Sequence, residues 1–162
     1  MFEKNWHELI RPTKIEIEKK ESDYVKFSTE PFERGYGVTI GNSLRRVLLS
    51  SIMGAAITSV WIESVDHEFS TVRGVKEDVT EIILNLKKTV IRMTDDKPAL
   101  LKIDVKGKKD VKAGDITHDG GVEVVNPDLH IATLSSDARL YMEMKAKLGR
   151  GYQPSEQNVD ET

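Results

Sequence analysis

The sequence contains no cysteine. This absence excludes a disulfide framework, a thiolate metal site and a cysteine nucleophile. The chain also lacks an apolar run of the roughly 18 residues that a membrane-spanning helix needs, and residues 1–7 contain no apolar core of a secretory signal. We therefore expect a soluble, cytoplasmic protein with no membrane contact.

No charge of one sign dominates, because 24 basic side chains stand against 27 acidic ones and the net charge is −3. This balance provides no global electrostatic attraction to nucleic acid or to an anionic membrane. A DNA-binding role would need a local basic patch, and the longest concentrations of Lys and Arg, at 106–112 and 145–150, are short and interrupted. The 162 residues suffice for one ordinary domain or two small ones.

The first third of the chain predicts a β-hairpin followed by a helix. Apolar and polar side chains alternate over residues 14–18 and again over 24–28, on either side of a polar turn at 21–23. A glycine-marked loop from Gly35 to Gly41 then leads into a short helix. We expect this helix to end near Gly54, because glycine is suited to the C-cap position.

This short helix is predicted to have two different faces. The face expected to pack inward comprises Ile40, Leu44, Val47, Leu48 and Ser51. The opposite face carries Asn42, Arg46 and Leu49, with Arg45 at its edge. An apolar side chain flanked by guanidinium groups is typical of a protein–protein contact, although an exposed leucine by itself is equally ordinary.

From about residue 54 onward the pattern indicates a strand-rich unit with one embedded helix. The helix is predicted from the spacing i, i+3, i+4 and i+7 of Val79, Ile82, Ile83 and Leu86. The predicted strands are 60–69, 89–93, 101–105, 122–125, 129–134 and 140–144, and turn signals separate them at 95–98, 107–110, 119–121 and 135–137.

These elements predict an α+β fold in two parts. Residues 1–53 form a hairpin and a helix, which are too small to bury a core alone, so another stretch of protein must cover them. Residues 54–152 form the β-rich part. The last residues, 153–162, are polar and acidic and are expected to be disordered.

Three sequence patterns could form a functional site, and each also has a purely structural explanation. The glycines of 35–41 resemble a dinucleotide fingerprint, but the third comes one residue late and no crossover unit follows, so a tight turn and a close helix–sheet approach explain them better. Asp115, His118 and Asp119 could ligate a metal, yet the same residues describe an ordinary turn. The pair Glu77–Asp78 suits a helix N-terminus. The residues alone indicate no active site.

Several motifs, in order along most of the chain, resemble the bacterial RNA polymerase alpha-subunit family. The most specific is the stretch from Glu33 to Ser51, which includes Glu33-Arg34-Gly35-Tyr36-Gly37 and Gly41-Asn42-Ser43-Leu44-Arg45-Arg46. The others are 67–71, 77–79, 84–87, 115–120 and 149–152. The resemblance extends from about Leu9 to about Tyr152.

The resemblance implies an assembly scaffold for DNA-directed RNA polymerase with no active site, cofactor or metal of its own. In this family the N-terminal region forms a homodimer, and one protomer meets the beta subunit while the other meets beta-prime. A dimerisation domain is interrupted by a β-rich insert domain, which would start near residue 53 here. The chain resembles a form truncated before the dimerisation domain resumes, and the separate DNA-binding domain of the family is absent.

The resemblance also assigns roles to individual residues. Arg46 and Leu49 match positions that contact beta, His67 matches a further position on the beta side, and Lys87 matches one linked to beta-prime. The partner-binding residues predicted in this way are Arg46, Leu49, Arg45, Asn42, His67 and Lys87. Two other hypotheses stay open, an enzyme that holds a nucleotide at the glycine loop and a DNA-binding module built on residues 106–112.

Overall fold

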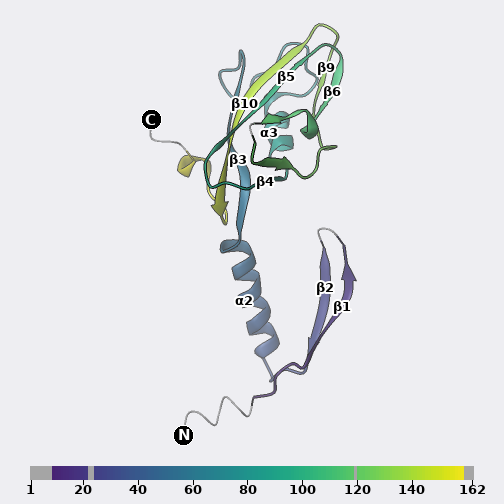
Figure 1. Ribbon diagram of the computed structural model, residues 1–162, viewed down its shortest axis with the longest axis vertical. Helices are drawn as coiled ribbons and strands as arrows, with labels where there is room; N and C mark the ends of the chain where they lie inside the picture. Colours follow the sequence, from purple (N-terminus) through teal and green to yellow (C-terminus); the bar gives the residue numbers. More distant parts are fainter. Residues whose placement is uncertain (1–8, 22–23, 119, 159–162) are drawn as a thin grey trace. The chain divides into compact units, whose positions relative to one another are not determined.

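The computed structural model describes residues 9–21, 24–118 and 120–158. The chain divides into two compact units, one ending at Ser51 and the other beginning at Ile52 (Figure 1). The described residues are mostly β-strand with two α-helices, α2 and α3, which agrees with an α+β fold.

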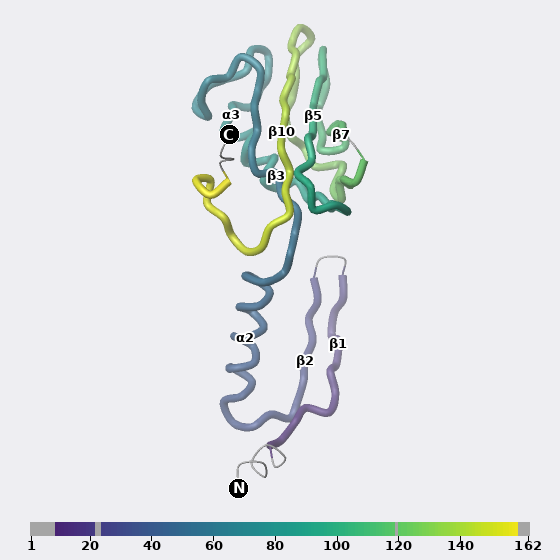
Figure 2. Tube along the Cα trace, turned by 60° about the vertical axis from the view of Figure 1, so that its left-hand side comes forward, coloured from purple at the N-terminus to yellow at the C-terminus, as the bar shows by residue number. Residues whose placement is uncertain are grey.

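The first unit contains the predicted hairpin. Strands β1 (Lys14–Lys20) and β2 (Val25–Glu30) pair in antiparallel fashion, with a register shift between Ile17 and Lys19. This pairing confirms the hairpin (Figure 2). Two residues of its predicted turn, 22 and 23, lie outside the described residues.

The helix that follows starts earlier and ends earlier than expected. Helix α2 spans Tyr36–Ser50, so most of the predicted glycine loop is helical, and Gly54 lies in the next strand instead of capping the helix. Gly35 supplies the N-cap with a φ of 88°, a left-handed conformation that glycine adopts without steric penalty. A methyl group at Gly41 would meet no described atom within 4 Å outside its own helix, so close helix–sheet packing does not explain that glycine.

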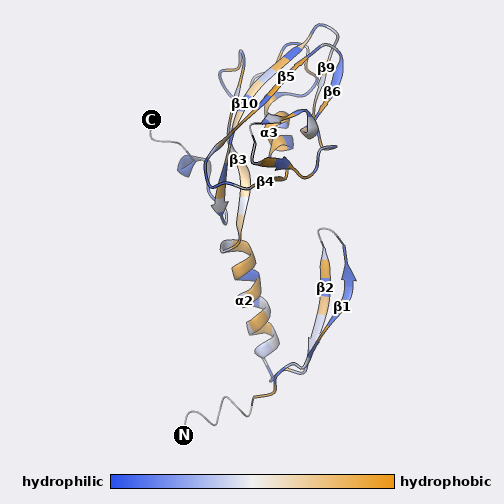
Figure 3. Cartoon of the chain, in the orientation of Figure 1, coloured by the Kyte–Doolittle hydropathy of each residue, from blue (hydrophilic) through white to orange (hydrophobic). Residues whose placement is uncertain are grey.

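The apolar side chains of the first unit are exposed. None of the residues of α2 is buried, and the face predicted to pack inward lies uncovered within the part of the chain that the structure describes. The apolar residues of the hairpin are exposed as well. Figure 3 shows this concentration of hydrophobic residues along α2 and β2. The described residues of the first unit therefore do not bury these side chains themselves.

The second unit is built on a six-stranded sheet with the order β7-β5-β10-β3-β4-β8, in which all neighbours are antiparallel. Its strands are β3 (Met53–Ile62), β4 (Ile91–Met93), β5 (Ala99–Lys106), β7 (Thr117–His118), β8 (Val122–Val124) and β10 (Arg139–Arg150). A second, two-stranded sheet pairs β6 (Lys109–Lys112) with β9 (His130–Leu134). Helix α3 (Val79–Leu86) lies against β9.

All the buried apolar residues of this unit form one core. Alternate residues of β10 enter it, because successive side chains of a strand point to opposite faces of a sheet. These are Leu140, Met142, Met144 and Ala146. The helix contributes Val79, Ile82 and Leu86, and Ile82 is completely buried.

The predicted elements of this unit are largely confirmed, with two corrections. Helix α3 spans Val79–Leu86, the residues of the predicted apolar stripe. The strands predicted at 89–93, 122–125 and 129–134 contain β4, β8 and β9, whereas those predicted at 101–105 and 140–144 lie within the longer strands β5 and β10. The strand predicted at 60–69 is wrong, because β3 begins at Met53 and ends at Ile62. The turn predicted at 107–110 is shorter, because β6 begins at Lys109.

The structure describes only part of the C-terminal stretch 153–162. Residues 153–158 contain one short 3-10 helix, Ser155–Gln157, and residues 159–162 lie outside the described part. The disorder expected for 153–162 remains a prediction.

Candidate partner-binding surface

Helix α2 carries four of the six predicted partner-binding residues. Asn42, Arg46 and Leu49 follow one another at spacings of four and three, with Arg45 beside them, so all four occupy one face of the helix. All are exposed, and 64% of Leu49 is accessible. Within the described residues, neither the guanidinium group of Arg45 nor that of Arg46 forms an ion pair. This face therefore presents Leu49 between two arginines that have no ion-pair partner among the described residues.

His67 lies in the second unit, in the segment that joins β3 to α3. The carbonyl oxygen of His67 accepts a hydrogen bond from the amide of Ser70 at 3.2 Å, and its ring lies 6.5 Å from the ring of Phe69, centroid to centroid. Phe69 is 80% exposed. The segment thus presents the imidazole of His67 beside the large, accessible ring of Phe69. The sequence analysis did not identify Phe69 as a candidate residue.

Lys87 is the C-cap of α3, and its amide bonds to the carbonyl oxygens of Ile83 and Asn85. The opposite end of the helix holds the His67 segment, because Thr80 Oγ1 donates to the Glu68 carbonyl oxygen at 2.8 Å. Eight helical residues span about 12 Å. The structure therefore places His67 and Lys87 at different ends of α3, and the four residues of α2 belong to the other unit.

The side chain of Glu77, just before α3, lies in a network of hydrogen bonds. It accepts hydrogen bonds from the Thr133 amide at 2.6 Å, the Thr133 hydroxyl at 2.9 Å and His130 Nε2 at 3.1 Å. Burial by itself would raise the pKa of Glu77, but the bonds from Thr133 and His130 outweigh it and hold this pKa below its usual value. Sequence reasoning assigned Glu77 only to a helix N-terminus, because its partners lie more than fifty residues away.

His130 continues this network to strand β6. Its Nδ1 atom contacts Oδ1 of Asp110, so both ring nitrogens face carboxylates. Burial by itself would lower the pKa of His130, but Asp110 and Glu77 favour the charged ring and raise this pKa above its usual value.

The outer face of the six-stranded sheet carries a polar and aromatic cluster. Arg139 binds Asp104 through two hydrogen bonds of 2.9 and 3.0 Å, and its guanidinium lies 5.2 Å from the centre of the Tyr141 ring. The hydrogen bond from Arg139 holds the pKa of Asp104 below its usual value. Trp61, 54% exposed, meets Tyr141 edge to face at 6.1 Å. The charges in this cluster compensate one another, so its chemistry does not require a ligand.

The other candidate sites are occupied by internal contacts. Asp115 accepts a hydrogen bond from Lys109 Nζ at 2.6 Å, and Lys112 Nζ lies 3.4 Å from Asp128 Oδ1. Two lysines of the basic segment 106–112 are thus paired with carboxylates. His118 lies in β7, and Asp119 is outside the described residues. Among the residues that the structure describes, no group of three His, Asp or Glu side chains is arranged so that it could hold a metal ion.

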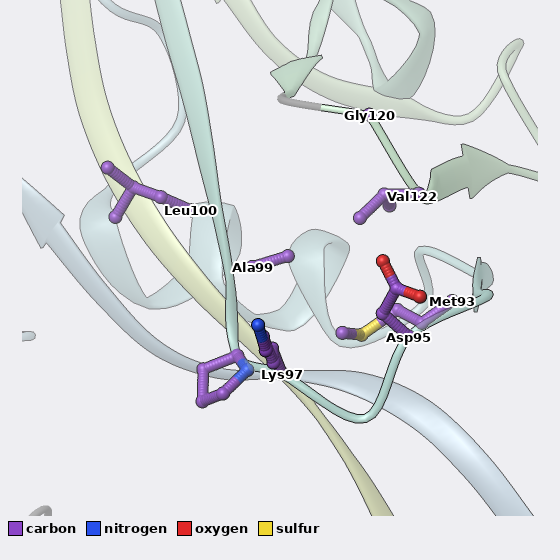
Figure 4. A pocket seen from close by; sticks show the side chains of 9 residues that line it. Met93, Asp95, Lys97, Ala99, Leu100, Gly120 and Val122 are labelled. Atoms are coloured by element: carbon purple, nitrogen blue, oxygen red, sulfur yellow. The ribbon is translucent and has the colours of Figure 1, made fainter.

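A shallow hollow of about 230 Å³ opens between the start of β5 and the loop before β8 (Figure 4). Its charged lining residues are Asp95 and Lys97, beside Met93, Val122 and two glycines. A methyl group on Gly121 would come within 3.3 Å of the Asp95 carboxylate, so the glycine permits this close approach. The described lining contains no pair of nucleophile and base.

Within the described range, none of the helices has the length and apolarity needed to cross a lipid bilayer. Residues 60–162, which include His67 and Lys87, match a family model described as the RNA polymerase Rpb3/RpoA insert domain. The chain is also 56% identical over 160 residues to the DNA-directed RNA polymerase subunit alpha of Geobacter metallireducens. That alignment covers 98% of this chain and 47% of the relative, so the chain spans about half the length of this curated protein.

Proposed function

This chain belongs to the bacterial RNA polymerase alpha-subunit family, and we propose that it acts as a non-catalytic assembly scaffold of that polymerase. In this proposal it pairs with a second alpha subunit and docks the beta and beta-prime subunits. The observation that carries the proposal is the exposed face of α2 formed by Asn42, Arg45, Arg46 and Leu49.

The composition of this face suits a protein partner. Arginine combines a delocalised charge with a planar fork of donors, and it is enriched in the energetic centres of protein interfaces. Leu49 adds an accessible apolar side chain between Arg45 and Arg46. Because no described carboxylate pairs with either guanidinium, a partner that supplies acidic or carbonyl oxygens would gain bonds without breaking existing ones. We assign this face to the beta subunit.

The other face of α2 has a different chemistry and suits a different partner. Ile40, Leu44, Val47 and Leu48 are exposed along one side of the helix. A continuous apolar stripe of this kind is typical of an obligate interface, which resembles a protein core cut in half. We assign it to the dimerisation domain, where a second alpha subunit and further strands of the same chain would cover it.

His67 and Lys87 extend the docking surface to the insert domain. Both are exposed, and they lie at opposite ends of α3. In the proposal His67 serves the beta side and Lys87 the beta-prime side. Phe69 beside His67 is a candidate apolar anchor for the same contact.

Capture of purified beta subunit by the full-length alpha subunit tests the proposal. Replacing both Arg46 and Leu49 by alanine removes the charge and the apolar side chain from the α2 face. Truncation of a central arginine anchor costs about 2 kcal/mol, which is roughly a 30-fold loss of affinity. We therefore expect the R46A/L49A variant to capture beta at least that much more weakly than the unmodified subunit.

A matched control replaces an exposed arginine and an exposed leucine of the insert domain, Arg92 and Leu100, by alanine. The control should capture beta with nearly unchanged affinity. Sedimentation of both variants shows whether dimerisation is retained. Unchanged capture by R46A/L49A would show that this face of α2 does not bind beta.

A further inference from the structure

The C-terminal end of the segment between β3 and α3 is hydrogen-bonded to strand β9. The amide of Lys76 donates to the Thr133 carbonyl oxygen at 3.0 Å, and the amide of Ser135 donates to the Gly74 carbonyl oxygen at 2.9 Å. Val75 and Leu134 form an isolated bridge between the same two stretches. We call this segment, residues 63–78, the strap, and its position depends on its contacts with β9.

The same segment is also fastened to the first turn of α3. The amide of Val79 donates to the Ser70 carbonyl oxygen at 3.2 Å, and Thr80 Oγ1 donates to the Glu68 carbonyl oxygen. Ser70 in turn bonds back to His67. Any shift of the residues just before α3 therefore reaches His67 and Phe69 through a short chain of hydrogen bonds.

Glu77 is the only carboxylate among the described residues that bonds to both Thr133 and His130. Its side chain is 11% exposed. The contacts join the strap to β9, and His130 then joins them to Asp110 of β6. Three stretches of chain far apart in sequence meet at one imidazole ring.

The protonation state of this ring decides how many contacts it can make. A neutral imidazole has one N–H donor and one acceptor nitrogen, whereas an imidazolium has two donors. The ionised carboxylates of Asp110 and Glu77 can only accept. Both bonds of His130 therefore exist together only when the ring carries its second proton, and loss of that proton sets a nitrogen lone pair against a carboxylate oxygen.

We propose that Asp110, His130, Glu77 and Thr133 form a proton-dependent clasp that positions the segment carrying His67 and Phe69. The clasp itself rests on the geometry above, and its consequence for docking rests on the proposed function. His130 and Glu77 are positioning residues, because neither is needed to touch the partner. Protonation of His130 closes the clasp, and deprotonation weakens the bond of Glu77 to His130 on β9 and the bond of His130 to Asp110 on β6.

The charges around the ring favour this assignment. From β6, Asp110 faces Nδ1, while Lys112, the register partner of His130, directs its ammonium group to Asp128. From the strap, Glu77 faces Nε2. Two carboxylates thus surround the ring, and together they raise the pKa of His130. The stabilisation is complete below the ordinary pKa of histidine, near 6.5, and it is lost as pH rises through the raised value.

Hydrogen exchange of the full-length alpha subunit tests the clasp directly. We would compare the protection of the Lys76 and Thr133 amides at about pH 5.5 and about pH 8.5, after correction for intrinsic exchange rates. Loss of one partly exposed hydrogen bond predicts that protection falls about fivefold at the higher pH. The H130Q variant should show low protection at both values, and D110N should reduce the pH dependence. Glu123→Gln, which alters an exposed ion pair with Arg92 on another strand, is the control and should behave like the unmodified subunit.

Capture of beta at the same two pH values tests the positioning role. Supporting results are a pH-dependent protection and a pH-dependent capture that both disappear in H130Q. A protection that does not change with pH, or that changes equally in H130Q, would overturn the clasp. If protection changes with pH but capture does not, the positioning role is wrong while the docking proposal stands. If beta is captured at neither pH, the docking proposal fails, and the hydrogen-exchange result alone then tests the clasp.

Discussion

Replacing Glu77 by glutamine is the sharpest single perturbation of the insert domain. The substitution keeps the shape of the side chain and removes its charge. In the unmodified chain the two carboxylate oxygens accept three hydrogen bonds, from the Thr133 amide, the Thr133 hydroxyl and His130. Glutamine has one acceptor oxygen and one amide nitrogen, so its NH₂ group must face one of the positions where a donor now lies.

The expected magnitude follows from these bonds. A hydrogen bond to a charged group contributes about 1.5–3 kcal/mol, and one between neutral groups about 0.5–1.5 kcal/mol. Two of the three bonds come from Thr133 to a side chain that is largely buried, and the third comes from a half-exposed histidine that solvent screens. We therefore expect E77Q to lower the free energy of unfolding by about 2 kcal/mol at neutral pH. For a unit of this size that loss lowers Tm by about 8 °C.

Urea unfolding of the 162-residue chain, followed by circular dichroism, measures this loss. Glu123→Gln is the matched control and should change the free energy of unfolding by no more than about 0.5 kcal/mol, because it alters an exposed pair. The pKa of Glu77 lies below its ordinary 4.5, so its contribution is present above that value and disappears as pH falls through the folded value. The difference between E77Q and the unmodified chain should therefore shrink as pH falls below 4.5. An equal stability of E77Q and the unmodified chain at neutral pH, or a stability difference that does not shrink at all as pH falls below 4.5, would refute this account.

Two further substitutions test the packing of α3. Ile82→Ala removes a completely buried side chain from the core, and we expect a loss of about 3 kcal/mol in urea unfolding, whereas Ile82→Val should lose about 1 kcal/mol. Asp78→Ala removes the N-cap acceptor of the Glu81 amide, whose bond is 2.6 Å long. Its loss should be about 1 kcal/mol, with Asp78→Asn retaining most of the stability as the control.

The sequence patterns that succeeded were local ones. Helix α3 follows from an apolar stripe at helical spacing and from the acidic pair Glu77–Asp78 at its N-terminus, where the structure shows Asp78 as the N-cap. The hairpin follows from strict alternation in 14–18 and 24–28. In each case the signal and the structure it predicts lie within the same few residues.

The errors occurred where a local signal conflicted with the sheet. Gly54, Ala55 and Ala56 are weak strand formers, and glycine after a helix suggests a cap, yet these residues begin β3. Pairing along β10, from Met142 to Arg150, stabilises this stretch as a strand. Strand β6 was not predicted at all, because Lys109 and Asp110 resemble turn residues but pair with β9.

The clasp could not be predicted from the sequence at all. Glu77 precedes a helix, Asp110 follows a glycine turn, and His130 is a lone histidine near a strand start. Each has an ordinary local explanation. Only the pairing of β6 with β9 and the return of the strap to β9 bring the three side chains together.

Under the proposed function, the two faces of α2 imply an order of assembly. A hairpin and a helix without any buried residue cannot offset the conformational entropy of ordering them. The apolar face formed by Ile40, Leu44, Val47 and Leu48 must therefore be covered before the helix becomes a stable platform. The Arg46 and Leu49 face presents a fixed geometry only on a folded helix, so binding there depends on that cover. Under the proposed function, dimerisation would therefore precede docking of the beta subunit. A dimer-deficient variant such as Leu48→Asp, with its Arg46 and Leu49 intact, should then bind beta as weakly as R46A/L49A does.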